Sequence, residues 1–331
     1  MTNKKDVFGT RAYYKPFHFD FAYEAYKRQN EIHWIPEEIS LAEDVKDWNT
    51  KLDKKEKNLL TQIFRFFTQA DIDIASAYND VYIPVFKQPE IRMMLDTFAA
   101  MEAIHIDAYS LLIETVGMPE SSYKAFQEYE EMQAKHDYFT NTTRSFKLNQ
   151  VEDILRKIVI YSAFGEGLQL FASFAMLLNF ARFGKMKGMS QIVTFSIRDE
   201  SLHVEAMIHL FREIVKQHKE IWTDEFKAEI YQIARDMVEL EDKFIDLAFT
   251  MGGIEGLSAE ETKEYIRFIA DRRLLQLGLK PNFKVKDNPI PWLAEMLSSV
   301  EHTNFFENRV TSYAKGAATG SFEKDVWGKY K

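Results

Sequence analysis

Two Glu-x-x-His pairs, Glu102/His105 and Glu200/His203, are the residues of this sequence whose types and spacing could do chemistry. Residues three apart share one face of a helix, so each pair can offer an oxygen and a nitrogen to a metal ion. A lone acid precedes each pair at a similar distance along the chain, and these two acids are Asp71 and Glu166. One inward acid from each of two helices, with a Glu-x-x-His pair from each of two others, forms a di-metal site in a four-helix bundle.

A single Glu-x-x-His pair is expected by chance at this composition and is typical of a solvated helix face. Two pairs with matched acids instead predict an oxygen-activating or radical-generating metalloprotein. Two divalent cations would balance the charge of four carboxylates, which makes their burial in a core feasible. Carboxylate and imidazole ligands suit iron or manganese; zinc accepts them too but offers no redox chemistry.

Tyr109 follows His105 by four residues and therefore lies on the same helical face. A phenol that close to an oxidised metal pair could lose an electron and a proton. The spacing fits equally well an ordinary core tyrosine with a hydrogen-bonded hydroxyl.

Asp199 directly precedes Glu200 and projects about 100° away from it on a helix. An acid beside a metal ligand is a natural partner for the free nitrogen of a ligand histidine. The alternative is a surface carboxylate paired with Arg198.

Composition excludes several other classes of protein. Hydrophobic residues make up 46% of the 331 residues, which is enough for a large core, and the net charge of −9 without dense Lys/Arg runs argues against nucleic-acid binding. The chain has no cysteine, so disulfides, thiolate metal sites and cysteine nucleophiles are excluded. The apolar stretch 168–181 is broken by Ser173 and Asn179 and predicts a core helix rather than a membrane span. MTNKKDVFGTRAYYKPF lacks the apolar region of a signal peptide, so we expect a cytoplasmic protein.

Long stretches free of glycine and proline predict an all-α fold. Helices are expected at 53–81, 90–116, 120–133, 150–183, 188–218, 223–250 and 258–276. The candidate ligands then fall on four separate helices, which would form the central four-helix core within a single domain, 51–307.

Two segments are expected to lie outside this bundle. Residues 1–50 form a weakly patterned arm that contains His33, Trp34 and Trp48. Residues 308–331 are rich in small and charged residues, which predicts a flexible tail. The tail's aromatic residues suit a docking peptide, although a frayed terminus has the same composition; they are Phe322, Trp327 and Tyr330.

Four motifs together resemble the small, radical-generating subunit of class I ribonucleotide reductase, a family with a ferritin-like helical bundle. They are EAIHIDAY (102–109), FGEG (164–167), SIRDESLH (196–203) and FFENRVTSY (305–313). The resemblance runs over roughly residues 20 to 315. It is much more specific than either metal motif alone.

The resemblance implies a role for each candidate residue. One metal ion would be bound by Asp71, Glu102 and His105, and the other by Glu166, Glu200 and His203. Tyr109 occupies the place of the family's stable tyrosyl radical. Trp34 would pass electrons between the surface and the metals, Asp199 would link it to a ligand histidine, and Tyr313 would relay the radical to the partner.

The resemblance also implies cofactors and partners. The metals would be a diiron, dimanganese or Mn/Fe pair, and the oxidising equivalent would be stored at Tyr109 or on the metals. The chain would form a homodimer and dock its C-terminal tail into the large catalytic subunit, which must supply the cysteines and the substrate site; whether a small activating flavoprotein takes part stays open. The alternatives are a ligand-binding di-metal oxidase on the same scaffold and a ferritin-like storage protein.

Overall fold

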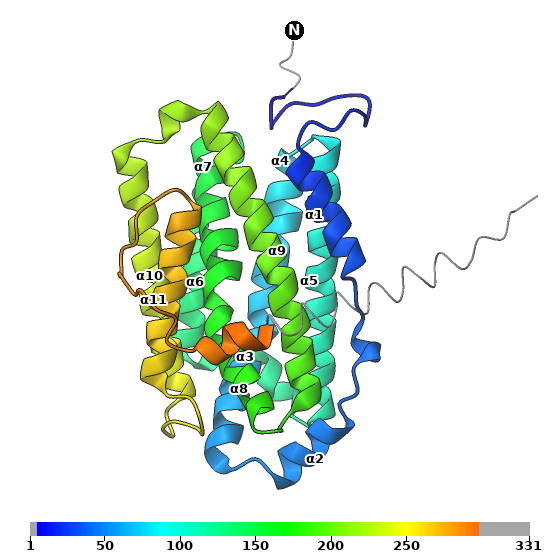
Figure 1. Cartoon of the computed structure of the whole chain (residues 1–331), viewed down its shortest axis with the longest axis vertical. Helices are drawn as coiled ribbons and strands as arrows, with labels where there is room; N and C mark the ends of the chain where they lie inside the picture. Colours follow the sequence, from blue (N-terminus) through cyan, green and yellow to red (C-terminus); the bar gives the residue numbers. More distant parts are fainter. Residues whose placement is uncertain (1–4, 298–331) are drawn as a thin grey trace, which may run out of the picture. The chain divides into compact units, whose positions relative to one another are not determined.

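The computed structural model describes residues 5–297, and this part of the chain is built from helices (Figure 1). The one pairing of extended backbone among these residues is an isolated bridge between Ile254 and Leu257. The chain divides into two compact units, Met1–Pro289 and Ile290–Lys331. The described part of the second unit holds a short helix at 291–297. The predicted all-α fold is confirmed.

Four helical segments form the centre of the first unit (Figure 1). Helix α3 packs against α5, helix α9 packs against η4 and α8, and contacts between α5 and α9 and between α3 and η4 join the two pairs. The segments that the sequence predicted to carry ligands therefore lie together. Their bounds are α3 (Lys54–Ser76), α5 (Pro89–Thr115), α7–η4–α8 (Val151–Lys157, Ile158–Gln169, Phe171–Arg182) and α9 (Lys187–Gln217).

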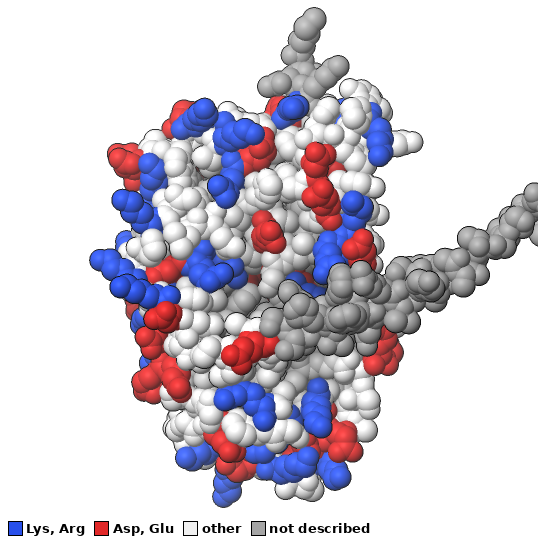
Figure 2. All heavy atoms as spheres, viewed as in Figure 1, with Lys and Arg blue, Asp and Glu red and all other residues white. Residues whose placement is uncertain are grey.

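Further helices cover this centre. Helix α10 (Asp224–Ala248) packs on η4, α3 and α6 (Glu130–Thr143), and α11 (Ala259–Gln276) packs on η4 and α8. Both confirm the predicted helices at 223–250 and 258–276. On the face drawn in Figure 2, acidic and basic side chains are interspersed, and neither sign forms an extended area.

Local sequence explains where several helices begin. Asp53 starts α3 with a capping box, in which its carboxylate accepts the Glu56 amide and the Glu56 side chain accepts the Asp53 amide. Pro89 occupies the first turn of α5, where a missing amide proton costs nothing. The start of α9 is capped from a distance, because Asp44 accepts the amides of Gly188 and Met189.

Two predicted α-helices contain π-helical segments. The predicted helix 53–81 ends as α3 at Ser76 and continues as the π segment η2 (Ala77–Tyr82) and the short α4 (Ile83–Val85). The predicted helix 150–183 contains the longer π segment η4. A π turn adds a residue between hydrogen-bonded partners and turns the following side chains to a new direction. Periodicity along the sequence gives no signal for such a local change.

The predicted helix at 120–133 is wrong in type and extent. Residues Glu120–Glu128 form the 3-10 helix η3, and α6 follows at Glu130–Thr143. Tyr129 interrupts them because its backbone is extended, with φ −114° and ψ 119°.

The weak pattern of residues 1–50 conceals two helices, α1 (Asp20–Glu31) and α2 (Ala42–Thr50), with a 3-10 turn, η1 (Pro36–Glu38), between them. Helix α1 packs on α5 and α9, and α2 packs on α9. Trp34, between α1 and α2, is only 2% exposed. The N-terminal segment thus covers the helices that carry both Glu-x-x-His pairs.

One helical stretch of the described chain, Val151–Arg182, is long and apolar enough to cross a membrane. Its most apolar window is entirely buried inside the protein. It is therefore a core helix, as the sequence predicted.

Candidate metal centre

The structure brings the six predicted ligands together in the centre of the bundle. Each of the six is at most 3% exposed. Ligand atoms of four of them lie within 4.8 Å of one another: Glu102, Glu166, Glu200 and His203. The Nδ1 atom of His105 lies 3.2 Å from the nearer Glu200 oxygen. Asp71 is buried beside His105, whose charge acts on its carboxylate.

Two carboxylates reach both histidines. One oxygen of Glu102 lies 3.0 Å from His203 Nδ1, and the other lies 3.6 Å from His105 Nδ1. The Glu200 oxygens are 3.2 Å from His105 Nδ1 and 3.7 Å from His203 Nδ1. Glu102 and Glu200 thus lie between the two histidines, where they could bridge a pair of ions. The terminal acids of the cluster are Asp71, on the His105 side, and Glu166, whose Oε1 lies 3.4 Å from His203 Nδ1.

Many polar atoms at the centre of this cluster have no hydrogen-bond partner among the described residues. They are Asp71 Oδ2, both Glu102 carboxylate oxygens, Glu166 Oε2, Glu200 Oε2 and both His203 nitrogens. Some of these atoms lie within 4 Å of each other without forming a hydrogen bond. Buried polar atoms are costly without partners. Atoms that converge without bonding each other fit metal ligands, so the donor set suits a pair of divalent cations.

The pKa values show how strongly the groups of the cluster depend on one another. Burial raises the pKa of Asp71 well above its usual range and raises that of Glu166 to about 7. Burial also opposes the charge of Glu102, but the two neighbouring imidazoles outweigh it and lower its pKa to about 2. The carboxylates likewise outweigh burial at His105 and His203 and raise their pKa values well above 6.5. A cation would take the place of the imidazole protons, since ligand imidazoles must be deprotonated.

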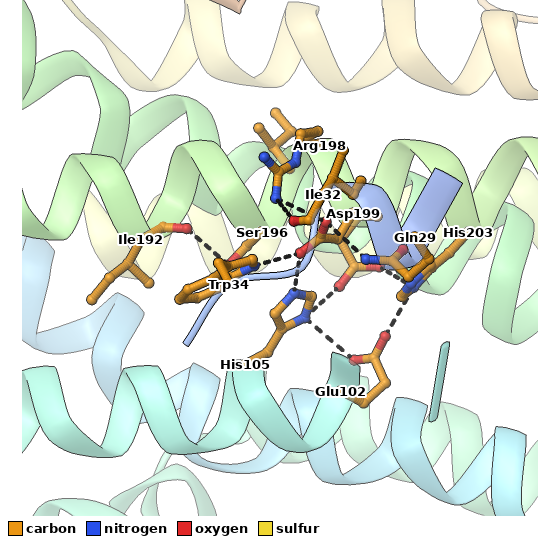
Figure 3. Close-up of polar contacts among 12 residues, drawn as sticks. Gln29, Ile32, Trp34, Glu102, His105, Ile192, Ser196, Arg198, Asp199 and His203 are labelled. Atoms are coloured by element: carbon orange, nitrogen blue, oxygen red, sulfur yellow. Dashed lines mark hydrogen bonds and ion pairs between the residues drawn. The ribbon is translucent and has the colours of Figure 1, made fainter. Parts of the chain in front are cut away.

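A polar network leads outward from His105 (Figure 3). Asp199 Oδ2 accepts a hydrogen bond from Trp34 Nε1 at 2.7 Å and lies 3.3 Å from His105 Nε2. Its other oxygen accepts from Gln29 Nε2 at 3.1 Å and from Arg198 at 3.4 Å. Burial opposes the charge on Asp199, but the bond from His105 and the other partners outweigh it and lower its pKa. The Trp34 and His105 rings stack with centroids 6.1 Å apart.

Asp199 is fully buried, so the surface carboxylate considered for it is excluded even though Arg198 does contact it. Gln29 was not identified from the sequence. It lies on α1, five residues before Trp34, and only the packing of α1 against α9 brings it to Asp199.

Tyr109 is buried near the Asp71 side of the cluster. Its hydroxyl donates to Ser196 Oγ at 3.1 Å, and Ser196 Oγ donates to the Ile192 carbonyl. Burial, followed by the charge of Asp71, raises the pKa of Tyr109 well above its usual value. The phenol therefore keeps its proton at neutral pH. Its geometry is compatible with both interpretations of the sequence.

A second phenol, Tyr78, contacts the cluster directly and was not identified from the sequence. Its hydroxyl donates to Glu166 Oε1 at 2.7 Å. A signal for it exists in the sequence, because Tyr78 follows Asp71 by seven residues, as Tyr109 follows Glu102. Burial and the nearby carboxylates raise the pKa of Tyr78 well above its usual value, so it remains a hydrogen-bond donor.

Tyr313 and the predicted docking residues Phe322, Trp327 and Tyr330 lie outside the described residues. The roles given to them stay predictions.

Comparisons with known proteins identify the family of the chain. A family model described as ribonucleotide reductase, small chain, matches residues 11–289. The probable ribonucleoside-diphosphate reductase small subunit 048L of Invertebrate iridescent virus 3 is 43% identical, over 94% of this chain and 86% of the relative. The corresponding subunit 376L of Invertebrate iridescent virus 6 is 42% identical, over 96% of this chain and 98% of the relative.

Solved structures agree in fold. The ribonucleotide reductase R2 subunit from Clostridium botulinum superposes with a TM-score of 0.77 at 25% identity, over 84% of this chain and 88% of that one. The dimanganese(II)-NrdF of Streptococcus sanguinis shares the fold, with a TM-score of 0.69 at 20% identity over 85% of this chain and 96% of that one. Family match, sequence identity and buried carboxylate cluster lead to one conclusion: the chain belongs to the ribonucleotide reductase small-chain family, as a ribonucleoside-diphosphate reductase small subunit with a buried di-metal carboxylate site.

Proposed function

We propose that this subunit generates and holds the oxidising equivalent that a large reductase subunit uses to convert ribonucleotides to deoxyribonucleotides. The observation that carries the proposal is a set of buried ligand atoms that have no hydrogen-bond partner within residues 5–297 and are joined to Trp34 through Asp199 and His105. In this proposal Asp71, Glu102 and His105 hold one ion, and Glu166, Glu200 and His203 hold the other. Two ions of iron or manganese, alike or mixed, would supply redox chemistry with oxygen or a reduced oxygen species.

The protein's own groups would control electrons, protons and water. The buried position of all six ligands keeps water from the reactive centre. Trp34 would carry electrons, because its ring stacks on His105 and its Nε1–H is fixed by the Asp199 carboxylate. Asp199 would also hold His105 in the tautomer that turns Nδ1 toward the ions. Removing a ligand histidine's outer partner usually costs about 10- to 100-fold in metal affinity or activity.

Two stores for the oxidising equivalent remain in the proposal. Tyr109 is close to the Asp71 half and could be oxidised to a radical, with Ser196 as its hydrogen-bond partner. The metals themselves could hold the equivalent instead. The stored equivalent would then travel through Trp34 and Tyr313 to the large subunit.

The proposal includes partners and location. Membership of the small-subunit family implies a large partner subunit. We infer that the tail at 308–331 docks into this large subunit. Residues 1–50 would serve as an N-terminal arm, and residues 51–307 as the metal-binding domain. Two copies of the chain would form a homodimer, and the protein would be cytoplasmic. An activating flavoprotein is an additional candidate partner.

Low-temperature electron paramagnetic resonance (EPR) tests whether the oxidising equivalent is stored on Tyr109 or on the metals. Metal-free protein is loaded separately with Fe(II), Mn(II) and both, then exposed to air. A tyrosyl signal that is lost in Tyr109→Phe but kept in Tyr265→Phe, a buried phenol on α11, would assign the radical to Tyr109. A coupled-metal signal without a tyrosyl signal would move the equivalent to the metals.

Deleting the residues after Arg309 tests the transfer. We expect metal loading to persist in the truncated chain while binding to the large subunit and its turnover are lost. Full-length protein that neither binds a large subunit nor supports its turnover after metal loading would refute the proposal. Activity that survives truncation would instead favour the ligand-binding oxidase.

A further inference from the structure

The π segment η2 (Ala77–Tyr82) places a buried phenol against one terminal acid of the metal site. Tyr78 is fully buried, and its hydroxyl donates to Glu166 Oε1 at 2.7 Å. No step proposed above for electron or radical transfer uses this residue. The other phenol of the site, Tyr109, donates to Ser196 and not to a carboxylate. Tyr78 therefore has a contact with the ligand set that Tyr109 lacks.

The ring of Tyr78 is fixed on several sides, so the direction of its hydroxyl is predetermined. It packs edge-on against Tyr82, Phe98 and His203, with ring centroids 5.5, 6.0 and 5.9 Å away. These contacts are typical aromatic pairs. A donor held this firmly can orient the group that accepts its hydrogen bond.

The acceptor is an acid that needs orientation. Glu166 lies in the π segment η4 between Gly165 and Gly167. Its Oε1 accepts the bond from Tyr78 and lies 3.4 Å from His203 Nδ1, while its Oε2 has no partner among the described residues. A carboxylate can bind a cation through one oxygen or both, and a phenol that occupies a lone pair of one oxygen fixes the rotation of the group and limits how it can bind.

We propose that Tyr78 is a positioning residue, which holds Glu166 with Oε1 toward His203 and thereby limits it to binding the metal ion of the His203 half through one oxygen. This inference rests on the proposed di-metal function. It makes the two halves unequal, because the described structure records no phenol bonded to the Asp71 carboxylate. Loss of the Tyr78 hydroxyl would free Oε1 and allow Glu166 to rotate or to bind through both oxygens.

The matched pair Tyr78→Phe and Tyr82→Phe separates this role from general packing. Tyr82 lies on the same π segment and is equally buried. Its hydroxyl contacts the Lys157 carbonyl and Ser162 Oγ, each at 3.2 Å, and no acid. Each variant thus removes one buried hydroxyl from η2, but only Tyr78→Phe releases Glu166.

The test is titration of the metal-free, full-length protein with Co(II) and with Mn(II). Visible absorption of bound Co(II) reports coordination number, and the Mn(II) titration reports affinity. For Tyr78→Phe we expect an altered Co(II) spectrum and about 10- to 100-fold weaker binding of one of the two Mn(II) ions. For Tyr82→Phe we expect the wild-type spectrum and affinities.

Tyr78→Phe with both wild-type readings would overturn the inference. If wild-type protein does not take up two ions, the proposed function itself fails, and the two failures are thereby distinguished. Should Tyr78→Phe not fold, 4-fluorophenylalanine at position 78 fills the place of the hydroxyl but cannot donate a hydrogen bond. A wild-type Co(II) spectrum with wild-type Mn(II) affinities in that protein would equally refute the role.

Discussion

The two Glu-x-x-His motifs are alike in sequence but lie in unlike surroundings. His105 Nε2 lies against Asp199, which also binds Trp34 and Gln29, so this half is supported by polar groups. His203 Nε2 has no hydrogen-bond partner among the described residues. The His203 ring packs instead on Phe98, with centroids 4.2 Å apart, and on Tyr78. A short motif thus determines which atoms converge in the cluster, whereas packing decides how firmly each side chain is held.

The terminal acids differ in the same way. Asp71 lies in the regular α-helix α3, while Glu166 lies in the π segment η4. Two buried basic side chains donate hydrogen bonds to carbonyls of η4. Arg273 Nε donates to Gly167 O at 2.8 Å, and Lys135 Nζ donates to Gln169 O at 3.4 Å. A methyl group at Gly167 would meet Arg273 Nε at 2.7 Å, so the glycine permits this approach. The half of the site that contains Glu166 and His203 therefore depends on residues distant in sequence.

The largest effect is expected from a bridging acid. Glu200→Ala should bring metal content below one ion per chain and lower nucleotide reduction by more than about 100-fold, because Glu200 reaches both histidines. Asp71→Ala and Glu166→Ala should each weaken mainly one half and retain one ion. Metal analysis of the purified proteins checks this. Retention of two ions by Glu200→Ala would show that it does not bridge.

The next effect concerns the buried pair that supports η4. Lys135 Nζ lies 2.6 Å from Glu241 Oε2 and 3.6 Å from the centre of the Phe66 ring. Burial opposes both charges, lowering the pKa of Lys135 and raising that of Glu241 to about 7. Lys135→Met leaves Glu241 alone and should cost about 3–5 kcal/mol in the free energy of unfolding.

Urea denaturation of the metal-free protein measures that cost. The double variant Lys135→Met/Glu241→Leu serves as the control, because an apolar pair of similar size should recover most of the loss. A single variant as stable as the wild type would show that the pair does not support this half.

A smaller effect is expected at the half that contains His105, which is supported by polar groups. Asp199→Asn keeps the size of the side chain but loses its charge, and it should lower metal affinity at the His105 half, or activity, by about 10- to 100-fold. Metal titration should leave the second ion nearly unchanged. Glu205→Gln, an exposed acid on the same helix, is the control. Equal weakening of both ions in Asp199→Asn would contradict the separation of the halves.

The smallest effect lies at the helix starts. Asp53 caps α3 from its own sequence, so Asp53→Ala should cost about 1 kcal/mol. Asp44 caps α9 from α2, and its burial makes the two amides of Gly188 and Met189 harder to satisfy without it. Asp44→Ala should therefore cost more, about 2 kcal/mol, by thermal or urea unfolding. Equal costs would mean that the remote cap gives α9 no additional stability.

The sequence by itself determined the ligand types, their spacing and the long helices that carry them. Glu102 and His105 share a face because any α-helix brings residues three apart together, and the apolar stretch 168–181 is a core helix because it has too few polar positions for a surface helix. These properties depend on neighbours along the chain, so local periodicity contains them. The donor chemistry likewise follows from residue type.

Only the tertiary structure decided the groups that hold the ligands in place. Gln29 reaches Asp199 across 170 positions of the chain, and Arg273 reaches the carbonyl of Gly167 across 106. Trp34 is buried because α1 and α2 fold over α5 and α9, although their own pattern is weak. The π segments are also held by residues distant in sequence. Tyr78 of η2 donates to Glu166 of η4, and Lys135 of α6 donates to the Gln169 carbonyl of η4. Such contacts have no periodic signature, because their free energy comes from residues that meet only after the chain has folded.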